Sequence, residues 1–245
     1  MKRPALPVFK HDGSIQRALV VVAHPDDVDF GSAGTVALLT KKDVHVAYCL
    51  VTSGDAGGDG SNHSREERSA IREAEQRAAA AEVGVTDLTF LRWPDGQVEA
   101  TLLLRREIAR CIRSFRPDLV ITQSPERNYA RIFASHPDHL ATGEATLRAV
   151  YPDARNPHAF PELAREGFEP HTVATVWLAG VSPTMVVDIT KTFDKKIAAL
   201  KRHESQVGHR DDIHKVVRQW ARMTAKNAGL GKARLAEGYR VVPTA

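Results

Sequence analysis

No run of about 18 apolar residues occurs in this 245-residue sequence, so we expect no helix that crosses a membrane. The first 13 residues carry charges and prolines but no apolar segment, which argues against a secretory signal peptide. There are only two cysteines, Cys49 and Cys111, and both stand in apolar or helical patterns where a thiol packs as a small hydrophobe. These absences exclude a disulfide framework and predict a soluble, cytoplasmic protein.

Positive charge is concentrated late in the chain, where aromatic residues are sparse. The net charge is +4, and the segment from Lys191 to Arg240 holds 13 Lys and Arg against 5 Asp and Glu. A basic segment can contact nucleic acid or an anionic substrate, but base stacking needs aromatic side chains interleaved with the charges. We therefore interpret the segment as solvated helices and expect no nucleic-acid partner.

Short apolar segments rich in β-branched residues alternate with helical patterns through the first 150 residues. Ser64 and Glu67 form a capping box at the start of one helix, and Gly84 follows its end. This alternation predicts an α/β fold with a doubly wound, mainly parallel sheet and right-handed crossovers. The expected strands are 17–23, 44–51, 88–91 and 119–122, and the expected helices are 64–82, 102–115 and 140–150.

The pattern is less regular after residue 150. Residues 151–171 contain several prolines and no clear period, so we expect a loop there. Two more strands are expected at 175–178 and 185–189, and two more helices at 192–202 and 211–223. The prediction is a single domain over residues 1–245, with a core at about 17–207 and a basic helical tail at about 208–245 whose end is mobile.

Four polar clusters each follow an expected strand. Ligands of an open α/β sheet bind at the carboxyl ends of its strands, so these clusters should meet at one edge. The clusters are HPDD at 24–27, Asp55 with its glycines, WPDG at 93–96 and HPDH at 136–139.

The two histidine motifs among these clusters offer a metal-ligand set. Imidazole nitrogens and carboxylate oxygens suit zinc, which in catalytic sites takes three protein ligands and leaves one position for water. Either motif alone could simply cap a helix, but both at one sheet edge favour a metal centre. The glycines of GSAGT could cradle a phosphate, yet the segment lacks the GxGxxG spacing and a P-loop lysine. A non-enzymatic binding protein that keeps the histidines for structure or metal storage is the other alternative.

With these motifs the sequence resembles the PIG-L/LmbE-like N-deacetylase family. The matching segments are AHPDDVDFGSAGT, VTSGDAGG, IREAEQRAAAAEVGV, FLRWPDG, SHPDHLATG, VVDIT and KIAALKRHESQ, which span roughly residues 17–207. The resemblance implies a Rossmann-like three-layer fold, one Zn²⁺ per chain and a homo-oligomer. It also implies a zinc-dependent hydrolase that removes an N-acetyl group from an amino sugar or a related small-molecule amide. An amidase acting on a thiol conjugate or a natural-product intermediate is the alternative.

The resemblance also implies roles for individual residues at the metal. His24, Asp27 and His139 occupy the positions of the zinc ligands. Asp26 occupies the position of the general base that activates the zinc-bound water. The residues alone do not distinguish Asp26 from Asp27.

Further roles concern the second histidine motif and the substrate. By resemblance, His136 is a protonated group that stabilises the oxyanion, and Asp138 orients His136 and raises its pKa. Arg72 and Asp95 match substrate-side positions, and Asp95 would bond sugar hydroxyls. The residues alone also allow a surface pairing of Arg72 with Glu75 or Gln76 and a plain turn role for Asp95.

The sequence departs from the family pattern in places that concern the substrate. Val28 stands where the family often has Glu, and Asp29 could reach part of the same space. The tyrosine that relatives often carry just before the second histidine motif is replaced by the segment 132–135. His203 fits a family motif, and we expect it to serve packing.

Overall fold

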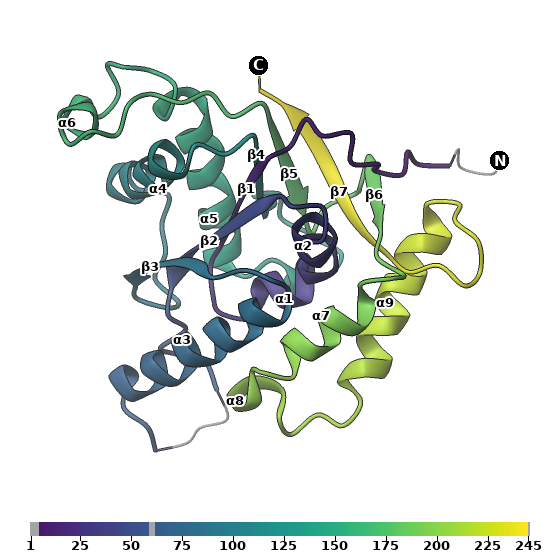
Figure 1. Ribbon diagram of the computed structural model, residues 1–245. Helices are drawn as coiled ribbons and strands as arrows, with labels where there is room; N and C mark the ends of the chain where they lie inside the picture. Colours follow the sequence, from purple (N-terminus) through teal and green to yellow (C-terminus); the bar gives the residue numbers. More distant parts are fainter. Residues whose placement is uncertain (1–4, 59–61, 245) are drawn as a thin grey trace.

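The computed structural model describes residues 5–58 and 62–244, and within them one sheet of seven strands dominates (Figure 1). The strand order is β3-β2-β1-β4-β5-β7-β6. All neighbours from β3 to β5 pair in parallel, whereas β7 is antiparallel to both β5 and β6. The predicted mainly parallel α/β sheet is therefore confirmed. The strands are β1 (Arg17–Val22), β2 (His45–Thr52), β3 (Asp87–Trp93), β4 (Leu119–Gln123), β5 (Thr175–Ala179), β6 (Met185–Asp188) and β7 (Ala236–Pro243).

Helices cover both faces of this sheet and complete three layers (Figure 1). Their bounds are α1 (Asp27–Gly31), α2 (Ala33–Thr40), α3 (Arg65–Glu82), α4 (Leu102–Phe115), α5 (Pro137–Arg148), α6 (Pro161–Arg165), α7 (Phe193–Leu200), α8 (Glu204–Val207) and α9 (Ile213–Asn227). In the described ranges, none of them has the length and apolarity needed to span a membrane.

Successive residues of the central strands point alternately into the two core clusters, one on each face of the sheet. Val20 of β1 belongs to the core cluster that includes residues of α2, α3, α7 and α9, whereas Val21 belongs to the one that includes residues of α4 and α5. Successive side chains of a strand point to opposite faces, so a strand covered on both faces must be apolar throughout. This explains the continuous apolar runs from which the strands were predicted.

The local signals for α3 and α4 agree closely with the structure. The Ser64 hydroxyl accepts a hydrogen bond from the Glu67 N–H, and the Glu67 carboxylate accepts one from the Ser64 N–H. The Thr101 hydroxyl likewise caps α4 through the Leu104 N–H. Caps of this kind depend only on neighbours in the sequence, so both helices begin where they were predicted.

The end of the chain differs from the predicted mobile helical tail. Helix α9 is present, but β7 then enters the sheet between β5 and β6. Its Glu237 is only 6% exposed and accepts hydrogen bonds from Lys196 Nζ at 2.6 Å and from the Thr35 N–H at 2.7 Å. A buried carboxylate interrupts the apolar alternation by which a strand is recognised in a sequence. The position of β7 therefore depends on partners that are distant in the sequence. The predicted loop over residues 151–171 is also partly helical, since α6 lies within it.

Candidate active site

The first histidine motif forms a tight turn between β1 and α1. Asp26 has φ 85° and ψ −25°, a left-handed conformation that Asp adopts more readily than most residues. Its carbonyl accepts the N–H groups of Asp29 and Phe30 and so starts α1. The turn leaves the side chains of 24–27 at the carboxyl end of β1, where the sheet topology predicts a ligand site.

The second histidine motif starts α5 at the end of the neighbouring strand β4. His136 is the N-cap, with its Nδ1 accepting the Asp138 N–H at 3.2 Å, and Pro137 occupies the first helical position. The helix can approach β4 because residue 143 is glycine, where a Cβ would lie 2.3 Å from the Gln123 carbonyl oxygen. Since β1 and β4 pair in parallel, the two motifs face each other.

The three residues predicted to bind zinc converge on one point. His24 Nδ1 lies 3.2 Å from His139 Nε2 and 3.4 Å from Asp27 Oδ2. His139 Nε2 lies 3.1 Å from Asp27 Oδ1. In a tetrahedral zinc site with bonds of about 2.0–2.1 Å, neighbouring donor atoms are about 3.3 Å apart. The donor spacing therefore fits a zinc ion held by these three side chains.

The opposite nitrogen of His24 is held by two carboxylates. His24 Nε2 lies 3.1 Å from Asp95 Oδ1 and 3.1 Å from Asp138 Oδ2. Carboxylates accept the Nε2 proton, which leaves the Nδ1 lone pair directed at Asp27 and His139, as metal-bound histidines require. Burial opposes a charged ring, but Asp138, Asp27 and Asp95 outweigh it and raise the pKa of metal-free His24 to about 12.

Two other donor groups lie close enough to share an ion. The first consists of His24, Asp95 and Asp138. Asp138 is fully buried, and its carboxylate already accepts hydrogen bonds from the N–H groups of Gly96 at 2.7 Å and Val98 at 3.2 Å. The second group joins His136 to His24 and His139. It overlaps the predicted ligand set and places His136 at the edge of the same centre.

Asp138 and Asp95 do not make the contacts that were predicted for them. The Asp138 carboxylate faces His24, and only its main-chain N–H contacts His136. The pKa of His136 is lowered, because desolvation and the positive charges of His24 and His139 outweigh the Asp138 carboxylate. The Asp138 carboxylate itself raises the pKa of His136, as expected, but its effect is the smaller one. Asp95 is 9% exposed, and its two oxygens contact His24 Nε2 and the Ala56 N–H.

Arg72 is buried behind the first histidine motif. It is 3% exposed and donates to the carbonyls of Gly54 at 3.1 Å and Pro25 at 2.7 Å, and to Asp26 Oδ2 at 3.1 Å. A Cβ at residue 54 would lie 2.2 Å from Arg72 Nη1, so the glycine makes room for the guanidinium. Arg72 therefore holds the loops after β1 and β2 together, and its burial rules out the alternative of a surface pairing.

Asp26 lies in the same turn as His24 and Asp27, and its carboxylate accepts a hydrogen bond from Arg72. Burial and the neighbouring Asp27 raise its pKa to about 7 in the metal-free chain, while Arg72 opposes the shift. Burial would also raise the pKa of Asp27, but His139 and His24 hold it well below its usual range. The two adjacent aspartates, which the sequence could not tell apart, thus differ in environment. The pKa of Asp27 is shifted down and that of Asp26 is shifted up, so the two carboxylates are not equivalent in the metal-free chain.

Comparison with known proteins agrees with this geometry. Residues 19–150, which include both histidine motifs, match the GlcNAc-PI de-N-acetylase (PIG-L) family. The chain belongs to the PIG-L family. It is 30% identical over 232 residues to the diacetylchitobiose deacetylase of Thermococcus kodakarensis, covering 94% of this chain and 84% of that protein. It is 34% identical over 197 residues to a Bacillus anthracis protein named "Probable N-acetyl-alpha-D-glucosaminyl L-malate deacetylase 2", covering 78% and 81%.

A solved structure extends the comparison to three dimensions. The N,N'-diacetylchitobiose deacetylase of Pyrococcus horikoshii, complexed with its inhibitor MPG, superposes on this PIG-L chain with a TM-score of 0.85. It is 28% identical in sequence, and the match covers 94% of this chain and 84% of that one. The predicted family and the three-layer fold are thereby confirmed.

From the sequence, Gln76 is considered only as a surface partner of Arg72, and its contact with the Asp26 turn is missed. Gln76 is fully buried, and its Oε1 accepts the main-chain N–H of Asp26 at 2.8 Å. It lies four residues after Arg72, so both project from the same face of α3. That spacing is the signal that could have identified it.

Proposed function

We propose that this protein is a zinc-dependent N-deacetylase that acts on an N-acetylated amino sugar or a closely related small molecule. The observation that supports this most directly is the spacing of His24 Nδ1, Asp27 and His139 Nε2, which suits a tetrahedral ion. Relatives that cover most of the chain are named as deacetylases of acetylated sugars.

A bound zinc ion would polarise the acyl carbonyl and make the attacking water more acidic. Asp26 would accept the proton of that water, with its carboxylate fixed by Arg72. A pKa near the working pH lets one carboxylate take this proton and later return it to the departing amine.

His136 would stabilise the negative charge that develops on the acyl oxygen. Its Nδ1 accepts the Asp138 N–H, so a neutral ring carries its proton on Nε2. With a lowered pKa, His136 can act as a neutral donor rather than as the protonated group expected from the resemblance. A positioned donor of this kind is commonly worth about 10²–10³ in kcat.

The test combines metal analysis with acetate release. We expect the purified chain to bind one zinc ion and to release acetate from at least one of N-acetylglucosamine, diacetylchitobiose and N-acetylglucosaminyl malate. N-acetylated amines without a sugar serve as the comparison. Acetate release from those compounds alone would support the alternative amidase instead. Failure to take up any divalent metal would contradict the proposed metal-dependent activity.

A further inference from the structure

Behind the Asp26 turn lies a buried chain of three polar side chains. Gln76 Nε2 donates to Asp29 Oδ2 at 2.9 Å, and His203 Nε2 donates to the same oxygen at 2.8 Å. At its other end Gln76 accepts the Asp26 N–H at 2.8 Å. All three side chains are fully buried, and His203 comes from the connection between α7 and α8.

Stability alone does not explain why these three polar side chains are buried together. Asp29 Oδ1 and His203 Nδ1 are buried without a hydrogen-bond partner among the described residues. Unpaired buried polar atoms are costly, and apolar side chains of similar size would fill the space at lower cost. The left-handed Asp26 backbone is a second unfavourable feature, and the same hydrogen bonds end on it.

We propose that His203 and Asp29 are positioning residues that act through Gln76 to hold Asp26 in its left-handed conformation, with the carboxylate beside the metal ligands. The inference rests on the function proposed above, in which Asp26 exchanges the proton. It gives His203 a role beyond packing, and it gives Asp29 a role in fixing the catalytic turn.

Two substitutions of His203 separate positioning from bulk packing. His203→Gln can keep an amide donor near the place of Nε2, whereas His203→Leu fills space without a donor. We expect His203→Leu to lower kcat by about 10- to 100-fold, the usual effect of removing a group behind a metal site, with KM and zinc content unchanged. His203→Gln should recover most of that loss. Equal losses in both variants, or wild-type kcat in His203→Leu, would overturn the proposal.

A double-mutant cycle tests whether His203 acts through Asp26, and crystal structures test the positioning role without relying on activity. If His203 acts through Asp26, His203→Leu should cause no further loss in an Asp26→Ala background. Crystal structures of both His203 variants should show Asp26 leaving the left-handed region in His203→Leu only. If the wild type releases no acetate, the proposed function fails, but these structures still decide the positioning role. An unchanged Asp26–Gln76 contact in His203→Leu would contradict it.

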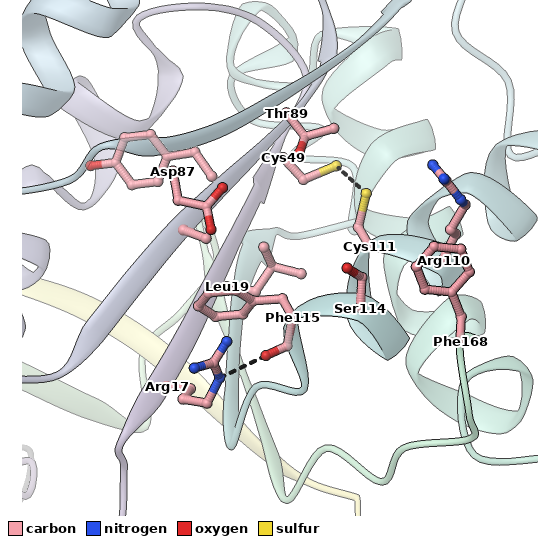
Figure 2. A pocket seen from close by; sticks show the side chains of 12 residues that line it. Arg17, Leu19, Cys49, Asp87, Thr89, Arg110, Cys111, Ser114, Phe115 and Phe168 are labelled. Carbon is pink, nitrogen blue, oxygen red and sulfur yellow. Dashed lines mark hydrogen bonds between the residues drawn. The ribbon is translucent and has the colours of Figure 1, made fainter. Parts of the chain in front are cut away.

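A second, independent observation concerns the two cysteines. A cavity of about 240 Å³ lies between the sheet and α4 (Figure 2). The first residues of β1 and β3 line it, whereas the candidate metal ligands follow the last residues of β1 and β4. Cys49 of β2 is buried and Cys111 of α4 is partly exposed, and their sulfur atoms are 3.8 Å apart. The Cys49 thiol donates to Cys111, which lowers the pKa of Cys111 and favours it as the thiolate.

We propose that Cys49 and Cys111 form an oxidative modification site that takes a small hydroperoxide from this cavity. The Cys111 thiolate attacks a peroxide oxygen, forms a sulfenic acid and releases water or an alcohol after protonation. Cys49 sulfur then attacks Cys111 sulfur, which forms the disulfide and expels the sulfenic oxygen as water. The peroxide is reduced by two electrons, and the two thiols are oxidised.

Mass spectrometry of the full chain treated with hydrogen peroxide tests this site. The wild type should lose two hydrogen atoms, resist thiol alkylation and recover both thiols with a reductant. Cys49→Ser should instead give a sulfenic acid at Cys111 that dimedone traps, while Cys111→Ser should leave Cys49 unmodified. A wild-type product carrying sulfinic Cys111 and an alkylatable Cys49, or a disulfide between two chains, would refute the proposal.

Discussion

Asp26→Asn should abolish most of the acetate release, lowering kcat by about 10³-fold, while one zinc ion stays bound. Removing a general base typically costs 10²- to 10⁴-fold. Asparagine has the same shape, tolerates the left-handed backbone and can still accept the hydrogen bond from Arg72. The fold and the ligands His24, Asp27 and His139 should therefore be undisturbed.

The measurement pairs steady-state acetate release with zinc content and melting temperature for the wild type and Asp26→Asn. The pH dependence of kcat/KM gives a further test. The base must be deprotonated, so the kcat/KM of the wild type should fall as the pH decreases through the pKa of Asp26. That pKa is raised to about 7 in the metal-free chain, and a bound cation lowers it, so the acid limb should lie below pH 7. A variant that keeps its activity to within tenfold would assign the base elsewhere.

His139→Ala should lose both zinc and activity without loss of the fold. The His139 side chain is 30% exposed, whereas that of His24 is 10% exposed and tied to two buried carboxylates, so His139 is the ligand that can be removed with the least damage to packing. Asp138→Asn is the matched control, because Asp138 touches His24 from behind and does not bind the ion in this proposal. We expect that control to retain zinc with about 10- to 100-fold weaker affinity.

Zinc affinity should also rise with pH. Metal-free His24 holds a proton because Asp138, Asp27 and Asp95 overcome the effect of burial and raise its pKa to about 12. A metal must displace the Nδ1 proton, so below that pKa each unit of pH should add up to about tenfold in affinity. Competition with a chelator at several pH values measures this. A pH-independent dissociation constant, or stoichiometric zinc in His139→Ala, would contradict the ligand assignment.

Local sequence patterns were sufficient for the elements that carry the site. Helix α3 begins at the Ser64 cap and β1 is a run of buried apolar residues, and neither feature needs distant partners to be recognised. Parallel pairing then brings the ends of β1 and β4 together. For this reason the sequence alone predicts that HPDD and HPDH lie at one edge of the sheet.

The sequence by itself determined the parallel α/β scaffold, the family, and the meeting of two histidine motifs, because periodicity, capping and strand ends are encoded by neighbouring residues. Only the tertiary structure decided which partners the buried polar groups take. Asp138 turned to His24 across 114 positions, His203 to Asp29 across 174, and Glu237 to Thr35 across 202. A buried carboxylate bonds to whichever donor the packed elements bring within reach. That choice depends on the distances between elements, which no local pattern records.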